Sequence, residues 1–302
     1  MSKNQGDLGP TIYSISNLIS QFNKNDFADF KNQEKSYFRE SGFDQFDNTL
    51  CFEPGSLLVF ASVPAMGKKA LSFSIIDKMT IQNAFKVRYF SNGELADDVF
   101  KRYILTHTEK STSTIQKELK DPQKSMEFLL TIKELMSKKL IIDDEKFQDY
   151  TELVERIRHD QLTHKSTIYF IDSILQLGTC GKSKREMNHC LKVLKQLAVE
   201  FNCVIVVLSH IDRTIEKRKK RIPKLSDLTS FGAFDRYADF IGFLHRPEYY
   251  GFLNTKKGKS TGGKMTIFIK RLGGRKHNTK FRFNMFCEIY KVKEIDWRNE
   301  SN

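Results

Sequence analysis

The residues that could do chemistry begin with a Gly-Lys pair at the end of a short loop. The segment Pro54–Ala70 has the pattern of a buried strand, a tight turn and the start of a helix, and Gly67 and Lys68 lie at the turn. Backbone N–H groups and the positive end of the helix dipole favour bound phosphate at such a turn, and the lysine reaches the terminal phosphates. The pattern predicts a nucleotide phosphate loop. We expect its phosphate contacts to come from Pro64, Ala65, Met66, Gly67, Lys68, Lys69 and Ala70.

One position of this loop departs from the usual pattern. A phosphate loop ordinarily follows Gly-Lys with Ser or Thr, whose hydroxyl binds Mg²⁺. Lys69 stands at that position here. An ammonium group would repel the ion, unless it replaces part of the ion's charge by contacting the phosphate oxygens directly. The sequence therefore predicts a nucleotide site and leaves open whether that site hydrolyses nucleotide.

Three further polar residues lie at or just after the ends of apolar, strand-like runs: Glu94, Asp172 and His210. The carboxyl ends of parallel strands meet at one edge of a sheet, so we expect these side chains near the phosphate loop. An aspartate there can orient Mg²⁺, a glutamate can polarise an attacking water, and a histidine can sense a terminal phosphate by hydrogen bonding. Considered alone, Glu94 is more often a charge at a helix start, and His210 an ordinary strand-end residue.

The elements that would position these residues alternate along the chain. Strand-like runs, each followed by a helical segment, lie at Leu57–Ala61, Val87–Ser91, Thr167–Ile171 and Cys203–Ser209. This alternation predicts an α/β fold with a mainly parallel, twisted sheet and helices on both faces. Two later runs, Lys264–Ile269 and Lys280–Phe286, have no helix between them and predict a C-terminal antiparallel strand pair.

The N-terminal segment has a different pattern. Between residues 11 and 22 the apolar residues recur at three- and four-residue steps, which is typical of a short amphipathic helix. The polar stretch Asn23–Arg39 behind it has the composition of a tether. We therefore expect two parts, a linker helix and tether at 1–35 and one nucleotide-binding domain at 36–302. The groove for this helix belongs either to the same chain or to a neighbouring subunit.

Composition narrows the partners. The 302 residues include 50 Lys and Arg against 37 Asp and Glu, a net charge of +13, which suits a polyanionic partner; a Lys-rich composition that only aids solubility is the alternative. Five widely spaced cysteines form no C-x-x-C pair, so neither a zinc site nor a disulfide framework is indicated. With no leader-like start and no apolar run long enough to cross a membrane, we expect a cytoplasmic protein.

In their order along the chain, these residues resemble the C-terminal ATPase domain of DnaB-type replicative helicases. The most specific stretch begins with Leu208-Ser-His-Ile-Asp-Arg213, continues through Ser226-Asp-Leu228 and Ala238-Asp239, and ends with Glu248-Tyr-Tyr250. The resemblance extends from about residue 36 to the C-terminus. It implies a RecA-like P-loop core, ATP and Mg²⁺, a hexameric ring and single-stranded DNA in a central channel. Regulatory RecA-like ATPases of the KaiC or RadA kind share the fold but do not account for this stretch.

The resemblance also implies roles for single residues. Lys68 takes the place of the phosphate lysine, Asp172 that of the magnesium-orienting aspartate, Glu94 that of the catalytic base and His210 that of the sensor. An extra residue in the Asn92-Gly93 turn could move Glu94.

Near its end the family places a phosphate-contacting lysine and, two residues later, an arginine finger that completes the next subunit's site. Lys270 and Arg271 are the candidates here. In a regular strand Arg271 is one residue early and faces the wrong side. A bulge would restore it.

By the same resemblance a basic segment faces the DNA channel. Its cationic residues, which can grip phosphates without reading sequence, are Arg213, Lys217, Arg218, Lys219, Lys220 and Arg221. Gly232 is retained from the family's DNA-contacting loop, but its Arg-Glu pair is replaced by Thr229-Ser230. A solvated loop without DNA contact is the alternative interpretation.

Two functions remain open on the sequence alone. The first is an ATP-driven DNA helicase or translocase acting in DNA replication, such as that of a phage, plasmid or other mobile element. The second is a catalytically degenerate relative that binds nucleotide or DNA and acts as a ring subunit, loader or inhibitor of a host helicase. We expect the family's primase-interacting domain to be missing, although a primase or loader remains an implied partner. The departures at Lys69, Leu272 and Thr229-Ser230 favour the second function.

Overall fold

The computed structural model describes residues 40–49, 52–82, 85–135, 139–178, 180–229, 232–255 and 257–295. These residues belong to one unit of the chain, Arg39–Asn302. The predicted helix at 11–22, its tether and the expected domain boundary at residue 36 lie outside the described residues.

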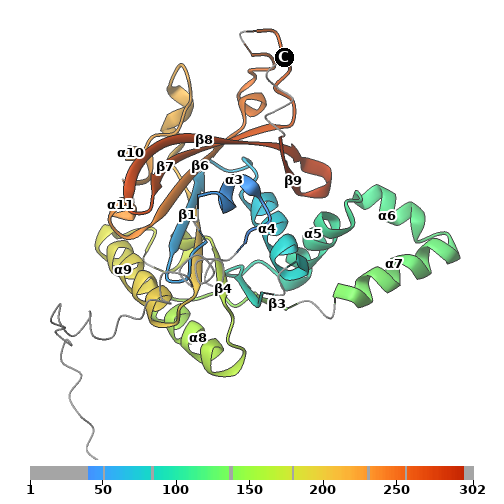
Figure 1. Cartoon of the computed structure of the whole chain (residues 1–302), viewed down its shortest axis with the longest axis horizontal. Coiled ribbons are helices and arrows are strands. Elements are labelled where there is room, and N and C mark those ends of the chain that lie inside the picture. The colour runs from blue at the N-terminus through green and yellow to red at the C-terminus, as the bar shows by residue number, and fades with distance from the viewer. Residues whose placement is uncertain are drawn as a thin grey trace, which may run out of the picture. The chain divides into compact units, whose positions relative to one another are not determined.

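A nine-stranded sheet forms the centre of this unit (Figure 1), with the strand order β3-β2-β4-β5-β1-β6-β7-β8-β9. The strands are β1 Leu57–Ser62, β2 Val87–Phe90, β3 Leu140–Asp143, β4 Ile168–Asp172, β5 Val204–His210, β6 Phe240–His245, β7 Lys264–Leu272, β8 Arg275–Phe286 and β9 Lys291–Glu294. Strands β1 to β6 pair in parallel, and β7, β8 and β9 pair antiparallel. The predicted parallel sheet and its terminal antiparallel pair are confirmed, and β3, β6 and β9 are additional.

Helices cover both faces of the sheet, as predicted. They are α3 Asp44–Asp47, α4 Lys68–Gln82, α5 Ala96–Thr108, α6 Thr112–Glu118, α7 Pro122–Leu135, α8 Tyr150–Thr163, α9 Lys184–Glu200, α10 Ser226–Thr229 and α11 Phe234–Tyr237. The chain steps through the sheet in one direction from β1 to β3 and in the other from β3 to β5. Because such crossovers are right-handed, α4 and α5 lie on one face and α8 and α9 on the other (Figure 1).

The core explains why these runs are so apolar. Every residue of β1 is buried, as expected for a central strand between two parallel neighbours. Beside it, Phe46 of α3 packs in edge-on contacts against Phe52, Phe60 and Phe281. Aromatic pairs of this geometry stabilise beyond their buried area. The short helix α3 therefore fastens the start of the described unit onto the sheet.

The register of the strands sets the position of the site. Ser62 at the end of β1 lies opposite His210 at the end of β5, and Asp172 at the end of β4 lies opposite Leu208. These strands therefore end at one edge of the sheet, and the loop that joins β1 to α4 lies there as well. The strand-end residues predicted from the sequence come together for this reason.

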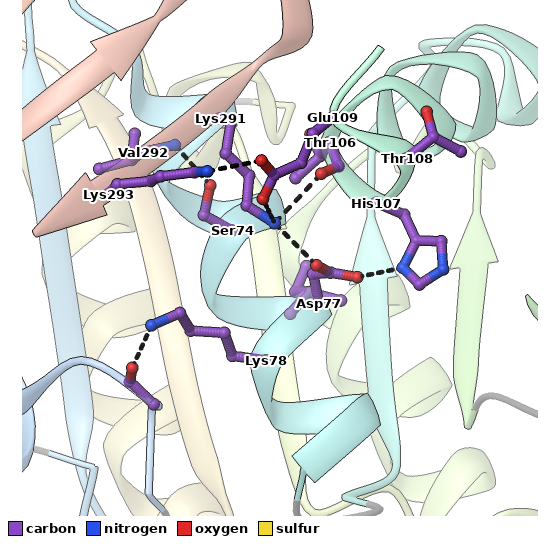
Figure 2. Close-up of polar contacts among 12 residues, drawn as sticks. Ser74, Asp77, Lys78, Thr106, His107, Thr108, Glu109, Lys291, Val292 and Lys293 are labelled. Atoms are coloured by element: carbon purple, nitrogen blue, oxygen red, sulfur yellow. Dashed lines mark hydrogen bonds and ion pairs between the residues drawn. The ribbon is translucent and has the colours of Figure 1, made fainter.

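A buried ionic network holds α4 against its neighbours (Figure 2). Asp77 of α4 lies 2.7 Å from Nδ1 of His107 on α5 and accepts a 2.9 Å hydrogen bond from Lys291 of β9. Burial alone would raise the pKa of Asp77, but the contacts with His107 and Lys291 hold it below its ordinary value. Ser74 of α4 also accepts a hydrogen bond from the backbone N–H of Val292. The helix that begins at the phosphate loop is thus fixed to both α5 and β9.

Candidate nucleotide site

A cavity of about 620 Å³ opens at this edge of the sheet. Its volume lies in the range of ordinary small-molecule sites. The residues that line it are Pro64, Ala65, Gly67, Lys68, Lys69, Ala70, Ser91, Asn92, Gly93, Glu94, Asp172, Ser173, Gln176, His210, Arg246, Met285, Cys287 and Tyr290. The structure therefore brings the predicted loop, Glu94, Asp172 and His210 into one site.

The loop has a shape that its residue types dictate. Gly67 has φ +95°, and a Cβ at this position would lie 2.5 Å from the sulfur of Met285, so no larger residue fits without displacing that side chain. Ala65 also has a positive φ, 64°. Met66 points into the core rather than the cavity, with 1% of its surface exposed. Since α4 begins at Lys68, the unpaired N–H groups of its first turn are close to the cavity.

Lys68 is buried among neutral acceptors. Its Nζ donates to the Ser62 hydroxyl (2.9 Å) and the Ser62 carbonyl (3.2 Å), and lies 3.3 Å from Nδ1 of His210. Burial lowers the pKa of Lys68 to about 8, an effect that attraction to Asp172 partly offsets and repulsion from Lys69 reinforces. The lysine therefore carries a desolvated charge that an entering phosphate would stabilise.

His210 is neutral at pH 7. Burial, followed by repulsion from Lys68 and Lys69, lowers its pKa to about 4. Because the Lys68 ammonium can only donate, Nδ1 of His210 acts as the acceptor and Nε2 carries the proton. The ring is thus able to donate one hydrogen bond, as the role of phosphate sensor requires.

Lys69 lies between the two carboxylates of the site. Its Nζ is 2.5 Å from Oε2 of Glu94 and 3.6 Å from Oδ2 of Asp172. The other oxygen of Glu94 accepts a hydrogen bond from Arg102 of α5, a residue that the sequence interpretation missed. Burial would raise the pKa of Glu94, but Lys69 and Arg102 together hold it below its ordinary value. Both oxygens of Glu94 therefore already have a cationic partner.

The residues of this side do not fit a bound Mg²⁺ ion. The ion requires oxygen ligands at about 2.1 Å in a nearly octahedral arrangement. The loop offers an ammonium where the hydroxyl ligand would lie, and that ammonium contacts Glu94 and approaches Asp172. Oδ2 of Asp172 in addition accepts a 2.8 Å hydrogen bond from the hydroxyl of Tyr89.

The extra residue before Glu94 is absorbed by a turn. Asn92 and Gly93 both have positive φ, and the Asn92 side chain accepts a hydrogen bond from the backbone of Phe147. Ser91 donates from its hydroxyl to the carbonyl of Glu94. The side chain of Glu94 therefore remains in the cavity.

Arg246 is a second cation that the sequence interpretation missed. It follows β6 and lines the cavity, and its guanidinium donates to the carbonyl of Ala65 (3.1 Å) and to Glu248 (3.0 Å). An arginine directly after an apolar run and before Pro247 is the signal that could have located it at the same sheet edge.

The expected finger residues lie away from the cavity of their own chain. Lys270 is the unpaired extra residue of a β-bulge in β7, because Ile241 pairs with Arg271 and Gly242 with Ile269. The bulge that the sequence interpretation required is therefore present. Within the described chain, Arg271 donates to the carbonyl of Ala238 (2.6 Å) and Lys270 to Asn278 (2.8 Å).

The basic segment divides into two groups. Arg218 forms a two-pronged ion pair with Asp227, and Arg221 donates to the carbonyls of Glu216 and Tyr250. These two arginines thus have contacts that order the segment. The other four cations are exposed: Arg213, Lys217, Lys219 and Lys220.

Gly232 has a packing role. A Cβ at this position would lie 2.5 Å from Met187 of α9, and the adjacent backbone N–H of Ala233 donates to Asn188 of the same helix. Its absent side chain therefore allows the chain to approach α9 closely. Ser230, from the neighbouring departure, lies outside the described residues.

Comparison with known proteins gives replicative helicases. The chain is 26% identical over 309 residues to a probable plasmid replicative DNA helicase of Chlamydia psittaci, covering 96% of this chain and 65% of that protein. It is 25% identical over 273 residues to the replicative DNA helicase DnaB of Rickettsia conorii, covering 86% and 54%. The chain thus spans about half to two thirds of the length of the curated relatives it matches.

Solved structures share the fold. The structure of an isolated ATPase domain superposes with a TM-score of 0.77 at 20% identity, covering 95% of this chain and all of that one. A DnaB-like replicative helicase, described together with its interactions with primase, gives 0.75 at 21% identity, covering 93% and 71%. The RecA-like fold class is therefore confirmed.

No helix in the described part of the chain combines the length and apolar character that a bilayer crossing requires. A sequence model of the DnaB-like helicase C-terminal domain matches residues 40–291. The chain belongs to this family of DnaB-like helicase C-terminal domains.

Proposed function

We propose that this chain binds ATP in the cavity beside Lys68 and acts on single-stranded DNA as a subunit of a hexameric replicative helicase ring. The observation that carries the proposal is the convergence of Lys68, Glu94, Asp172 and His210 on one cavity at the carboxyl edge of the sheet. Ligands bind at this edge in open parallel sheets. One relative is a probable plasmid helicase, so a mobile element is the setting we propose.

The environment of Lys68 supports a triphosphate as the ligand. A buried ammonium without an opposite charge in direct contact is costly, and its contacts here are a hydroxyl, carbonyls and an imidazole. Phosphate oxygens would supply the opposite charge, and the neutral His210 would donate to the same group. The first-turn N–H groups of α4 add further donors.

The exposed cations of the basic segment support DNA as the partner. Arg213, Lys217, Lys219 and Lys220 project from the loop region that follows β5. Lysine and arginine in this arrangement bind the phosphate backbone of single strands without reading its sequence. A ring of such subunits would place them around one strand, and primase is the partner that the neighbouring helicase structure makes reasonable.

A second candidate function, nucleotide binding without turnover, is favoured by Lys69. Its ammonium and Arg102 each contact one oxygen of Glu94, which lowers the basicity of the carboxylate that would activate water. A chain of this kind would act as a nucleotide-loaded ring subunit, loader or inhibitor.

ATP hydrolysis by the wild type, Lys68→Ala and Lys69→Thr separates the two candidates. Hydrolysis by the wild type that single-stranded DNA stimulates and Lys68→Ala abolishes supports the helicase. An inert wild type, with hydrolysis gained in Lys69→Thr, supports the non-hydrolysing subunit. Glu94→Gln in the Lys69→Thr background is the control, because it should remove any gained activity. Failure of the wild type to bind ATP at all contradicts both candidates.

A further inference from the structure

The carboxylate side of the cavity contains a cation of its own. We infer that the site binds nucleoside triphosphate without a Mg²⁺ ion, and that the Lys69 ammonium takes over the ion's charge. This inference rests on the proposed function, because it assumes that the cavity takes ATP. It adds the chemical form of the ligand, the free triphosphate rather than its magnesium complex.

The position of Lys69 carries the first step. Its Nζ lies 2.5 Å from Glu94 and 3.6 Å from Asp172, so one ammonium bridges the two carboxylates that would otherwise orient a hydrated ion. Lys69 is the second residue of α4 and lines the cavity, and 36% of its side-chain surface is exposed. A lysine has three donors on a flexible stem, so Nζ can keep one carboxylate contact while it donates to a phosphate oxygen.

The balance of charge carries the second step. Lys68, Lys69 and Arg102 provide three positive charges, against two negative charges from Glu94 and Asp172. The arginine that also lines the cavity, Arg246, pairs with Glu248 outside this group. The site is therefore net positive before any ion binds, as a polyphosphate requires. A dication would enter within contact distance of a fixed ammonium and be repelled.

The absence of suitable ligands carries the third step. The residue after Lys68 supplies no oxygen, and both oxygens of Glu94 accept hydrogen bonds from cations. Oδ2 of Asp172 accepts from Tyr89. An ion would have to displace Lys69 and Arg102 before it met two protein oxygens, whereas a phosphate group gains donors from the same side chains.

Isothermal titration of ATP into the full chain, in excess EDTA and then in excess Mg²⁺, tests the inference. We expect the wild type to bind ATP in EDTA, with a Kd within about threefold of the value in Mg²⁺. Lys69→Thr restores the hydroxyl ligand and removes the ammonium, so its ATP affinity should become at least about tenfold tighter in Mg²⁺ than in EDTA.

Two further variants isolate the charge. Lys69→Met keeps the length of the side chain and should weaken ATP binding in EDTA by about tenfold, whereas Lys69→Arg should retain most of it. Thermal unfolding of each variant by circular dichroism shows that the fold is intact. Binding by the wild type only in Mg²⁺, or equal ATP affinity of Lys69→Met and wild type in EDTA, overturns the inference and leaves the proposed function standing. Absence of binding in both buffers overturns the proposed function as well.

Discussion

The two sides of the nucleotide cavity hold adjacent lysines in opposite ways. On the neutral side, formed by Ser62, Val63 and His210, Lys68 is 7% exposed and contacts uncharged acceptors. On the carboxylate side, formed by Glu94, Asp172 and Arg102, Lys69 is more exposed and forms ion pairs. The charge of Lys68 is thus desolvated and lacks an opposite charge in contact, while that of Lys69 is already compensated.

This difference separates binding from turnover. The neutral side retains everything that phosphate binding requires, because the loop shape, the lysine and the histidine are all in place. The departure from the usual loop pattern falls on the carboxylate side, where the metal and the attacking water would be held. One changed residue can therefore alter the chemistry of the site and leave its affinity for nucleotide intact.

The largest expected effect is the loss of Lys68. Lys68→Met removes charge-assisted hydrogen bonds to phosphate, which contribute about 1.5 to 3 kcal/mol, so the Kd for ATP should rise about 10- to 150-fold. Titration calorimetry measures the change. Lys101→Met, an exposed lysine on α5, is the matched control and should bind as the wild type does. Equal affinity of the Lys68 variant and the wild type would mean that the neutral side does not hold phosphate.

The pH dependence of binding should reveal the same lysine. Since the pKa of Lys68 is lowered to about 8, the free protein loses this charge above that pH, and ATP affinity should fall about tenfold between pH 7 and pH 9. The unfolded chain keeps the proton up to the ordinary value of 10.5, so this lysine makes the free protein more stable as the pH rises from about 8 toward that value. Calorimetry in buffers of different ionisation enthalpy should detect proton uptake on ATP binding near pH 8.5.

A Lys68→Met variant provides the control for the pH experiment. It should lose both the proton uptake and most of the fall in affinity. A wild type whose ATP affinity is constant from pH 7 to pH 9 would contradict the depressed pKa on which the neutral side depends.

The basic segment extends the comparison to DNA. Reversing the charge of exposed Lys219 and Lys220 should weaken binding of single-stranded DNA several-fold and reduce the log–log salt slope by about 1.4, roughly 0.7 for each lost phosphate contact. Fluorescence anisotropy of a labelled oligonucleotide measures both quantities. The same reversal at exposed Lys101 and Lys124 should change neither. An unchanged slope in the first variant would assign the segment to solvent rather than to DNA.

The smallest expected effect has the opposite sign. Glu94→Gln removes a negative charge near the phosphates and leaves Lys69 and Arg102 without that partner, so ATP should bind about two- to fivefold more tightly. Glu118→Gln, remote from the cavity on α6, is the control. Weaker binding in Glu94→Gln would show that the carboxylate positions the cations for phosphate instead of competing with it.

Strand ends made the site predictable from the sequence. Asp172 and His210 follow buried runs that could only be parallel strands, so their shared edge followed from topology alone. Arg102 was not predictable, because its contact with Glu94 depends on how α5 packs after a turn. Strand β9 was missed for a related reason: its four residues alternate charge and apolarity, and they are held by the buried Lys291 rather than by a long apolar run.

Residue type alone was least informative in the basic segment. All six of its cations were expected to contact DNA, yet Arg218 and Arg221 have partners within the chain. Their partners Asp227 and Tyr250 lie further along the sequence, where spacing gives no indication of a contact. The bulge at Lys270, by contrast, was anticipated from a mismatch in strand phase, because side chains in a strand alternate strictly between faces.

A crystal structure of the full chain with a slowly hydrolysed ATP analogue, grown in Mg²⁺, tests the central claim most directly. The account predicts phosphates against Lys68 and the first turn of α4, with Nζ of Lys69 in contact with a phosphate oxygen and no metal between Glu94 and Asp172. Phosphates bound through a Mg²⁺ ion, with Lys69 displaced from both carboxylates, would contradict it.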